Sequence, residues 1–321
     1  MSRPLVLSLG SVNADFQLRV HGPPEPGRTM LGEDFVRLGG GKAANVAFLA
    51  RRLGQEARLL ARVGGDEPLR EQALGPLRAA GVDLAGVSVA ADCATGVALI
   101  AVLPDGRKCI LLAGNANDAW DEAKLRAAVA AVEAAPAGSV LVADYEVPAH
   151  VVARTAAVAR LRGLPIVIDP SPAERVELAA LSGTAAVTPN PVEAEGLTGI
   201  AVDGVAAAAE AAHRLRTLGV AMPCLKLGDG GCVVAWGGGM VAIPPPQVTP
   251  VDRTGAGDAF AGALAVALLE RRHPREAACF AVAAASLAVT AHGSQPAYPA
   301  RDEVERLLPS LLEAAHDLPV S

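Results

Sequence analysis

The segment Asp252-Arg253-Thr254-Gly255-Ala256-Gly257-Asp258-Ala259-Phe260 joins an apolar stretch with prolines (241–251) to a helical run (259–269) through a turn with two glycines. Such a turn at the start of a helix exposes unpaired backbone N–H groups at the positive end of the helix dipole, and this arrangement binds anions. A carboxylate beside an anion site is unusual, because the two negative charges repel. The position of Asp258 is explained if it accepts a proton from a hydroxyl group that attacks phosphorus. The alternative is that Asp258 only caps the helix, although a cap does not require the glycines.

Strand-like and helix-like segments alternate along most of the 321 residues, a length that fits one large domain. The first strand is expected at 5–9 and the first helix at 43–53. Further strand–helix pairs are expected at 57–63 and 69–80, 139–143 and 149–161, 165–168 and 174–181, and 185–187 with 192–197 and 205–218. This rhythm predicts an α/β fold with a mostly parallel sheet covered by helices on both faces.

Two regions interrupt the rhythm. Short stretches of residues 12–38 alternate between apolar and polar side chains on either side of a Pro/Gly-rich turn at 22–27. This pattern predicts exposed antiparallel strands. Residues 95–103 and 107–112 flank Pro104-Asp105-Gly106, a hairpin signal. Together these segments predict a small β-sheet outside the main layer.

Composition excludes several classes of protein. The net charge of −6 argues against a nucleic-acid surface. The five cysteines lack CxxC spacing, so we expect reduced thiols in a cytoplasmic protein. The longest uncharged helical stretch, 277–291, is too short to span a membrane. The start, Met1-Ser2-Arg3-Pro4, leads directly into a strand, so no signal peptide is expected.

The run Gly39-Gly40-Gly41-Lys42-Ala43-Ala44 fits a dinucleotide-binding fingerprint, which would make the protein an NAD-dependent oxidoreductase. The run does not follow the first strand, however, and residues 58–64 lack the acid that the fingerprint requires. It is not a P-loop either, since Ala43 stands where Ser or Thr would hold magnesium. The glycines are better explained by close approach to a polyol.

Six motifs in order resemble those of the ribokinase-like (PfkB-type) carbohydrate kinases, and the resemblance extends over nearly the whole chain. They are 10–15 (GSVNAD), 40–45 (GGKAAN), 95–100 (TGVALI), 188–193 (TPNPVE), 227–231 (LGDGG) and 252–260. The resemblance implies one domain over 1–321 with a three-layer α/β sandwich, a mostly parallel central sheet and a β-sheet lid at about 12–38 and 95–112.

Asn13 and Asp15 follow the first strand, where ligands bind in α/β sheets, and their side chains suit sugar hydroxyls. The alternative is an Asx-turn. The resemblance implies that Gly41, Lys42, Asn45, Glu146 and Asp258 complete the sugar site. For Glu146 the alternative is a plain surface acid. Ala43 departs from the glycine usual in the family.

The resemblance also implies ATP and Mg²⁺. Asn190 and Glu193 would organise magnesium, with Glu193 acting through water; the alternative is a capping-box variant. Lys226, Gly228, Gly231 and Gly257 would lie along the nucleotide; for the 226–231 segment the alternative is a tight hairpin turn. Lysine at 226, where the ribose branch usually has threonine, puts ribose in doubt and favours the fructose and keto-sugar-acid branches.

A monovalent cation, K⁺, is a further expected cofactor. The positions that match the family's potassium ligands are Asp252, Thr254, Ala288, Ala291 and Gly293. Ala297 stands where the pattern has serine, so one ligand is missing.

The predicted function is transfer of the γ-phosphoryl group of ATP to a primary hydroxyl of a pentose, and ribose is the favoured pentose. Asp258 would be the base, and the N–H groups of Gly255, Ala256, Gly257 and Asp258 would stabilise the transferring group. The alternatives are a kinase for fructose, a 2-keto-3-deoxy sugar acid or a nucleoside, and a non-catalytic sugar-sensing relative. The expected partners are a sugar and ATP, with no nucleic acid and no membrane. Because sheet edges are usually paired, a homodimer through the lid strands is also expected.

Overall fold

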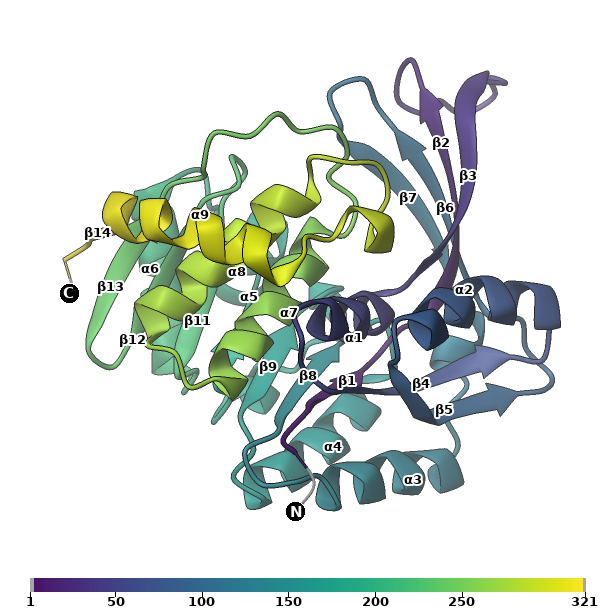
Figure 1. Ribbon diagram of the computed structural model, residues 1–321, viewed down its shortest axis with the longest axis horizontal. Helices are drawn as coiled ribbons and strands as arrows, with labels where there is room; N and C mark the ends of the chain where they lie inside the picture. The colour runs from purple at the N-terminus through teal and green to yellow at the C-terminus, as the bar shows by residue number, and fades with distance from the viewer. Residues whose placement is uncertain (1–2, 320–321) are drawn as a thin grey trace.

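A ten-stranded sheet runs through the middle of the protein in the computed structural model, which describes residues 3–319 (Figure 1). The strand order is β14-β13-β12-β11-β10-β9-β8-β1-β4-β5. The strands are β1 (Val6–Leu9), β4 (Ala57–Gly64), β5 (Asp83–Ala90), β8 (Val140–Asp144), β9 (Ile166–Asp169), β10 (Ala186–Val187), β11 (Met222–Lys226), β12 (Cys232–Trp236), β13 (Gly239–Ile243) and β14 (His316–Asp317). Pairing is parallel from β5 to β11 and antiparallel from β11 to β14. The mostly parallel sheet is therefore confirmed.

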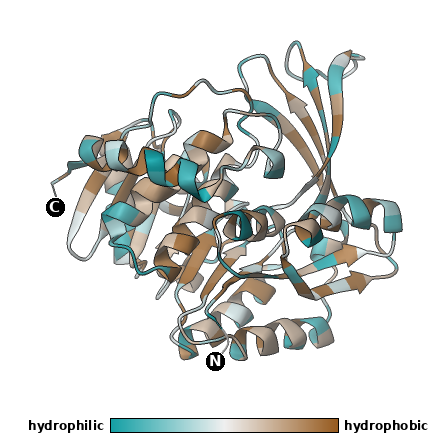
Figure 2. Cartoon of the chain, viewed as in Figure 1, coloured by the Kyte–Doolittle hydropathy of each residue, from teal (hydrophilic) through white to brown (hydrophobic). Residues whose placement is uncertain are grey.

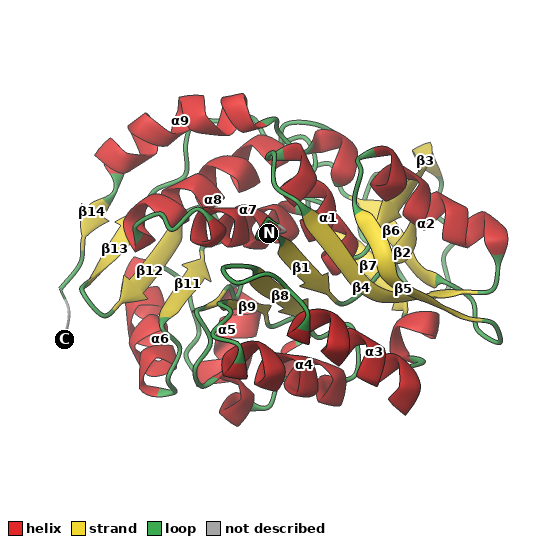
Figure 3. Ribbon diagram, turned by 60° about the horizontal axis from the view of Figure 1, so that its bottom comes forward, coloured by secondary structure: helices red, strands yellow, loops and turns green. Residues whose placement is uncertain are grey.

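Helices cover both faces of this sheet, which gives three layers (Figure 3). One face carries α1 (Lys42–Arg52), α2 (Glu67–Ala79), α7 (Ala256–Leu269), α8 (Pro274–Ala288) and α9 (Arg301–Ala314). The other carries α3 (Glu122–Glu133), α4 (Ala149–Leu161), α5 (Pro191–Thr198) and α6 (Val205–Thr217). The prediction of no signal peptide rested on residues 1–4, and two of these, Met1 and Ser2, lie outside the described residues.

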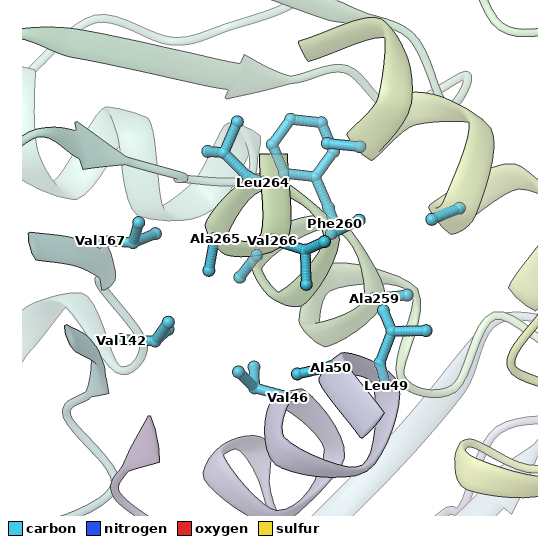
Figure 4. Packing of buried hydrophobic residues seen from close by; sticks show 14 of the residues in the cluster. Val46, Leu49, Ala50, Val142, Val167, Ala259, Phe260, Leu264, Ala265 and Val266 are labelled. Carbon is cyan, nitrogen blue, oxygen red and sulfur yellow. The ribbon is translucent and has the colours of Figure 1, made fainter. Parts of the chain in front are cut away.

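Two apolar cores lie on the two faces because successive strand residues point to opposite sides. Val6 and Leu59 belong to the core under α1 and α7, whereas their neighbours Leu7 and Leu60 belong to the core over α3 and α4. Figure 4 shows the first core, where α1 packs on α7. A Cβ at Gly262 of α7 would lie 3.3 Å from Leu49 Cδ2. Small residues therefore let these two helices, which both carry functional side chains, approach closely.

A second sheet of four strands, which we call the lid sheet, rises beside the main one with the order β3-β2-β6-β7 (Figure 1). It consists of β2 (Asn13–Val20), β3 (Gly32–Gly40), β6 (Gly96–Val102) and β7 (Lys108–Ala113). β2 pairs antiparallel with β3, and β6 with β7, as the two turn signals predict. β2 and β6 join the two hairpins in parallel.

One predicted helix is wrong. The stretch 174–181 forms two short 3-10 turns, Ala173–Arg175 and Leu178–Leu181, instead of an α-helix. Leu181 is the one buried residue of the two turns, so no apolar face at helical spacing holds a helix there. Across residues 3–319, none of the helices has the length and apolar character required to cross a membrane.

Candidate active site

A cavity of about 560 Å³ opens between the lid sheet and the carboxyl ends of the parallel strands. All six predicted sugar-site residues besides Asp258 line it, together with seven of the other predicted site residues. The first group is Asn13, Asp15, Gly41, Lys42, Asn45 and Glu146 taken with Asp258; the second is Asn190, Glu193, Lys226, Gly228, Thr254, Gly255 and Gly257. Segments that lie up to 245 residues apart in the chain, from Asn13 to Asp258, thus meet in one cavity.

Residues 255–258, which we call the anion turn, form the glycine-containing turn predicted at the start of α7. Gly255 precedes the helix with φ 75°, a left-handed conformation that favours glycine. Its missing Cβ is also required, since a Cβ there would lie 2.6 Å from Ser294 Cβ. The N–H groups of Gly255, Gly257 and Asp258 donate no hydrogen bond to any residue between 3 and 319. They are therefore free to bind an anion.

Asp258 does not cap α7, because within residues 3–319 no side chain accepts a hydrogen bond from this helix start. The capping alternative is wrong for this residue. The residue is instead buried, with 8% exposed, and its Oδ2 accepts a 2.7 Å hydrogen bond from Asn45 Nδ2. Gln295 Nε2 in turn donates to Asn45 Oδ1 at 3.1 Å and holds that amide in place. The Asp258 carboxylate is therefore fixed with Oδ1 facing Lys42.

A buried chain of charges runs across the floor of the site. Lys42 Nζ lies 3.5 Å from both Asp258 Oδ1 and Asp169 Oδ1, and Lys226 Nζ lies 3.6 Å from Asp169 Oδ2. These separations are long for hydrogen bonds, so the attraction is mainly Coulombic. Burial alone would lower the pKa of Lys42, but Asp169 and Asp258 raise it well above its ordinary value. Lys42 is therefore a permanent cation between the two carboxylates.

Asn13 and Asp15 lie in β2 and face the cavity, without the Asx-turn. Asn13 Oδ1 accepts a 2.8 Å hydrogen bond from Asn117 Nδ2, which fixes the amide. Asp15 is 5% exposed, and its Oδ1 has no hydrogen-bond partner among the described residues. Burial, together with the charges of Glu146 and Asp258, raises the pKa of Asp15 to about 7. A buried acceptor without a partner is costly unless a ligand supplies the donor.

Glu146 follows β8 and lines the cavity, so it is not a plain surface acid. Its Oε2 accepts a 2.6 Å hydrogen bond from Ser11 Oγ, which itself accepts from the Lys42 N–H at 2.9 Å. Asp144 accepts hydrogen bonds from the N–H groups of Ser11 and Glu146 at 3.1 and 2.9 Å. Burial raises the pKa of Glu146, although Lys42 opposes this. Ser11 and Asp144 thus tie the ends of β1 and β8 to the start of α1.

The capping-box alternative for Asn190 and Glu193 is realised. Asn190 Oδ1 accepts from the Glu193 N–H at 2.9 Å, and Glu193 Oε2 accepts from the Asn190 N–H at 2.8 Å. Both residues also line the cavity. Burial and the charge of Asp169 raise the pKa of Glu193. The cap leaves Oε1 of Glu193 available, so the magnesium role is compatible with it.

The hairpin alternative for 226–231 is also realised. Leu227 N donates to Gly231 O at 2.8 Å and closes the turn between β11 and β12. Gly228 lines the main cavity and a second one of about 360 Å³, which also contacts Ala256. Gly231 lines neither. A Cβ at Gly257 would lie 3.3 Å from Lys226 Nζ, which places this ammonium over the anion turn.

The predicted potassium residues gather beside the cavity. Asp252 Oδ1 accepts from Thr254 N at 2.8 Å, while Oδ2 accepts from Gln17 Nε2 at 2.7 Å and from Gly293 N at 2.9 Å. Two buried hydroxyls, Thr254 Oγ1 and Ser294 Oγ, have no partner within the part of the chain that the structure describes. Ala288 and Ala291, at and just beyond the end of α8, do not line the cavity.

Several residues of the site were not predicted. Asp144 and Asp169 end β8 and β9, and the rule that ligands bind at carboxyl strand ends could have found them. Arg253 and Lys108 also line the cavity. Lysine is rare in this chain, and three of its four lysines line the cavity, so this rarity was the available signal for Lys108.

Known proteins resemble this chain over nearly its whole length. The model of the family described as pfkB family carbohydrate kinase matches residues 3–301. The chain is 32% identical to a ribokinase of Haemophilus influenzae over 95% of this chain and 99% of that one, and 33% identical to a ribokinase of Bacillus subtilis over 94% and 98%. The solved structure of Arabidopsis thaliana ribokinase complexed with ribose and ATP aligns with a TM-score of 0.81 and 30% identity, covering 96% of this chain and 99% of that one.

The chain therefore belongs to the pfkB family of carbohydrate kinases. The family resemblance inferred from the six motifs is confirmed. The predicted three-layer α/β architecture is confirmed as well, by the layers of the structure and by this alignment.

Proposed function

We propose that this protein is an ATP-dependent ribokinase, which transfers the γ-phosphoryl group of ATP to the primary hydroxyl of ribose and forms ribose 5-phosphate. One observation carries the proposal: a single cavity contains Asp258, the N–H groups beside it that have no partner in residues 3–319, and the side chains of Asn13 and Asp15. Relatives named ribokinase, each about 30% identical over nearly the whole chain, support it.

In the proposed reaction Asp258 accepts the proton of the sugar hydroxyl while that oxygen forms a bond to the γ-phosphorus. The bond from this phosphorus to the bridging oxygen breaks, and ADP leaves with the electron pair. Charge on the transferring group is stabilised by the N–H groups of Gly255, Gly257 and Asp258, whereas the fourth predicted donor, the Ala256 N–H, points to Arg253 O at 3.5 Å. Lys42 Nζ, 3.5 Å from Oδ1, holds the Asp258 side chain in position. The products are a sugar phosphate, ADP and a proton.

The nucleotide would extend from the main cavity into the second one, past Gly228 and Arg253, which line both. The Lys226 ammonium lies next to Gly257, where it would contact a phosphate oxygen of the nucleotide. Glu193 and Asn190 would hold Mg²⁺ through its waters, and when bound the ion neutralises phosphate charge. Among residues 3–319 no cluster of three or more His, Cys, Asp or Glu is arranged to hold a metal ion, so phosphate and water would supply most ligands.

A monovalent cation fits the loop around Asp252, because the unpartnered hydroxyls of Thr254 and Ser294 are oxygen donors that a hard cation prefers. Asp252, Gly293 and the carbonyl groups of Ala288 and Ala291 would complete its surroundings. When bound, K⁺ would hold the segment 252–254, which leads into the anion turn, in a fixed conformation. Ser294 offers a hydroxyl in the same loop, although Ala297 has none.

Two observations favour a plain sugar as the acceptor. None of the residues that line the cavity is aromatic, whereas a nucleoside base needs a stacking surface. Phe16 and Phe35 stack on each other in the lid sheet, and Tyr145 is buried in the core. Lys226 Nζ lies next to Gly257 of the anion turn, where an ammonium suits a phosphate group, and the sugar panel below tests whether this lysine also changes the choice of sugar.

We also propose a homodimer through the lid sheet. Its outer face carries exposed apolar residues, Phe35 (61%), Leu99 (50%) and Leu111 (71%). Figure 2 shows hydrophobic positions along these strands, away from the main cores. A second copy of this chain, with the same face, would cover them by two-fold symmetry.

The function is tested by a coupled assay of ATP turnover with ribose, other pentoses, fructose and other hexoses, keto-sugar acids and nucleosides. We expect the highest kcat/KM for ribose. A clear preference for another acceptor would replace ribose while retaining the kinase. Ribose binding without turnover of ATP would identify a sugar-sensing relative.

A further inference from the structure

Lys108 is a charged residue on an otherwise apolar wall of the cavity. The wall is formed by alternate residues of β6 and β7, namely Ala98, Ile100, Ile110 and Leu112. Lys108 shares their face because it lies two residues before Ile110 and pairs with Val102 across the hairpin. Lys108 is exposed, so its ammonium is not buried among these alkyl groups, but it is the one charged side chain on this face of the hairpin in the described part of the chain.

The position of Lys108 along the hairpin directs it to the anion turn. The Asn13 end of the lid sheet lies at Gly96, and Lys108 lies at the opposite end of β6 and β7. The hairpin tip contacts the segment before the turn, since a Cβ at Gly106 would lie 3.7 Å from Val251 O. Asp258 and Asp252 are among the carboxylates whose charges act on the Lys108 ammonium.

Lys108 differs from the other two lysines of the cavity in having no ionic partner. Lys42 and Lys226 are held by Asp169, whereas Lys108 has no carboxylate within 4.0 Å in the described part of the chain. The N–H groups of Gly257 and Asp258 also lack partners among residues 3–319. Lys108 on the lid and the unpaired N–H groups of α7 therefore line the same cavity, and an anion bound there would satisfy both.

We propose that Lys108 is a catalytic residue that contacts the transferring phosphoryl group of ATP from the side opposite the anion turn. The inference rests on the proposed kinase function and deepens it. The transferring group carries its charge on three equatorial oxygens, and the N–H groups of α7 cover one side of it. The Lys108 ammonium would contact the oxygens on another side of this group. Because β7 carries the residue, full stabilisation of the transition state requires the lid sheet to be in place over the site.

The test compares three variants. Lys108→Gln removes the charge, Lys108→Arg keeps it, and Arg107→Gln removes the neighbouring charge of the same hairpin. Arg107 is a matched control because its side chain is 73% exposed and pairs with Asp105 instead of lining the cavity. For each variant kcat and KM are measured, together with the affinity for sugar plus ADP–aluminium fluoride, which imitates the transferring group, and for sugar plus ADP.

We expect Lys108→Gln to lower kcat by about 10- to 100-fold, less than the roughly 10²–10³ of a fully buried donor, because Lys108 retains contact with solvent. Its affinity for the aluminium fluoride complex should fall by a similar factor, with that for ADP nearly unchanged. Lys108→Arg should recover most of the loss, and Arg107→Gln should match the wild type.

The proposal is overturned if Lys108→Gln keeps kcat within about a factor of two of the wild type. It is also overturned if the variant's loss appears only as a raised KM for a sugar that carries a carboxylate or phosphate, since Lys108 would then bind the acceptor. The wild-type sugar panel is measured first. If another sugar replaces ribose, the variants are tested with that sugar, so an error in the acceptor is distinguished from an error about Lys108.

Discussion

Asn45 Nδ2 donates a 2.7 Å hydrogen bond to Oδ2 of Asp258, and this contact joins α1 to the start of α7. It occupies one carboxylate oxygen and leaves the other, Oδ1, 3.5 Å from Lys42 Nζ. The hydrogen bond and the ion pair together fix the orientation of the carboxylate. A general base must be held in hydrogen-bond reach of the proton that it accepts, and these contacts supply that constraint.

Asp258→Asn should lower kcat by about 10²–10⁴-fold, the usual loss when a general base is removed. The fold should remain intact, because the carbonyl oxygen of asparagine can still accept the hydrogen bond from Asn45. Steady-state kinetics and calorimetric sugar binding check this prediction. Turnover near that of the wild type would show that Asp258 is not the base.

Asp15→Ala should raise the KM for the sugar by about 10- to 100-fold, which corresponds to the roughly 1.5–3 kcal/mol of a hydrogen bond to a charged group. The KM for ATP should change little, because Asp15 Oδ1, a buried oxygen of the cavity with no partner in the described part of the chain, is proposed to accept from the sugar and not from the nucleotide. Both constants are obtained from initial rates. An equal rise in both would point to a structural role for Asp15.

Asp15→Asn should stabilise the folded protein at pH 8. Burial raises the pKa of Asp15 from 3.8 to about 7, so the folded state binds the proton more tightly than the unfolded state. The charged carboxylate therefore costs stability as the pH rises from about 4 to about 7, and the cost is largest above pH 7. Removing it should add roughly 2–4 kcal/mol at pH 8.

Denaturant unfolding of the wild type and Asp15→Asn at pH 8 and pH 5 measures this difference. The gain should shrink as the pH falls, since Asp15 of the wild type is then mostly protonated. A variant that is less stable than the wild type at pH 8 would contradict the prediction.

Leu111→Glu should convert the protein from a dimer to a monomer. Leu111 lies on the outer face of the lid sheet, in register with Leu99, which pairs with Phe16. A charge buried at the centre of an apolar interface costs several kcal/mol. Leu161→Glu is the control, because Leu161 is 88% exposed at the end of α4 and far from the lid in sequence. Sedimentation at micromolar concentration gives both masses, and a monomeric wild type would rule out the dimer.

The sequence by itself determined the class of fold and the family. Alternation of strand and helix patterns is a local property, and the glycine turn before Asp258 has a local signature, so both could be recognised without coordinates. The hairpin at 104–106 was found for the same reason. The helix expected at 174–181 failed because helix formation there depended on burial that the surrounding structure does not provide.

The tertiary structure decided which side chains act on one another. Asp169 and Lys108 belong to no motif, yet the sheet places Asp169 between Lys42 and Lys226, and the lid sheet places Lys108 on the cavity wall. Their charges matter because they are close in space while far apart in the chain. Coulombic interaction depends on distance and burial, and a linear pattern of residues contains neither.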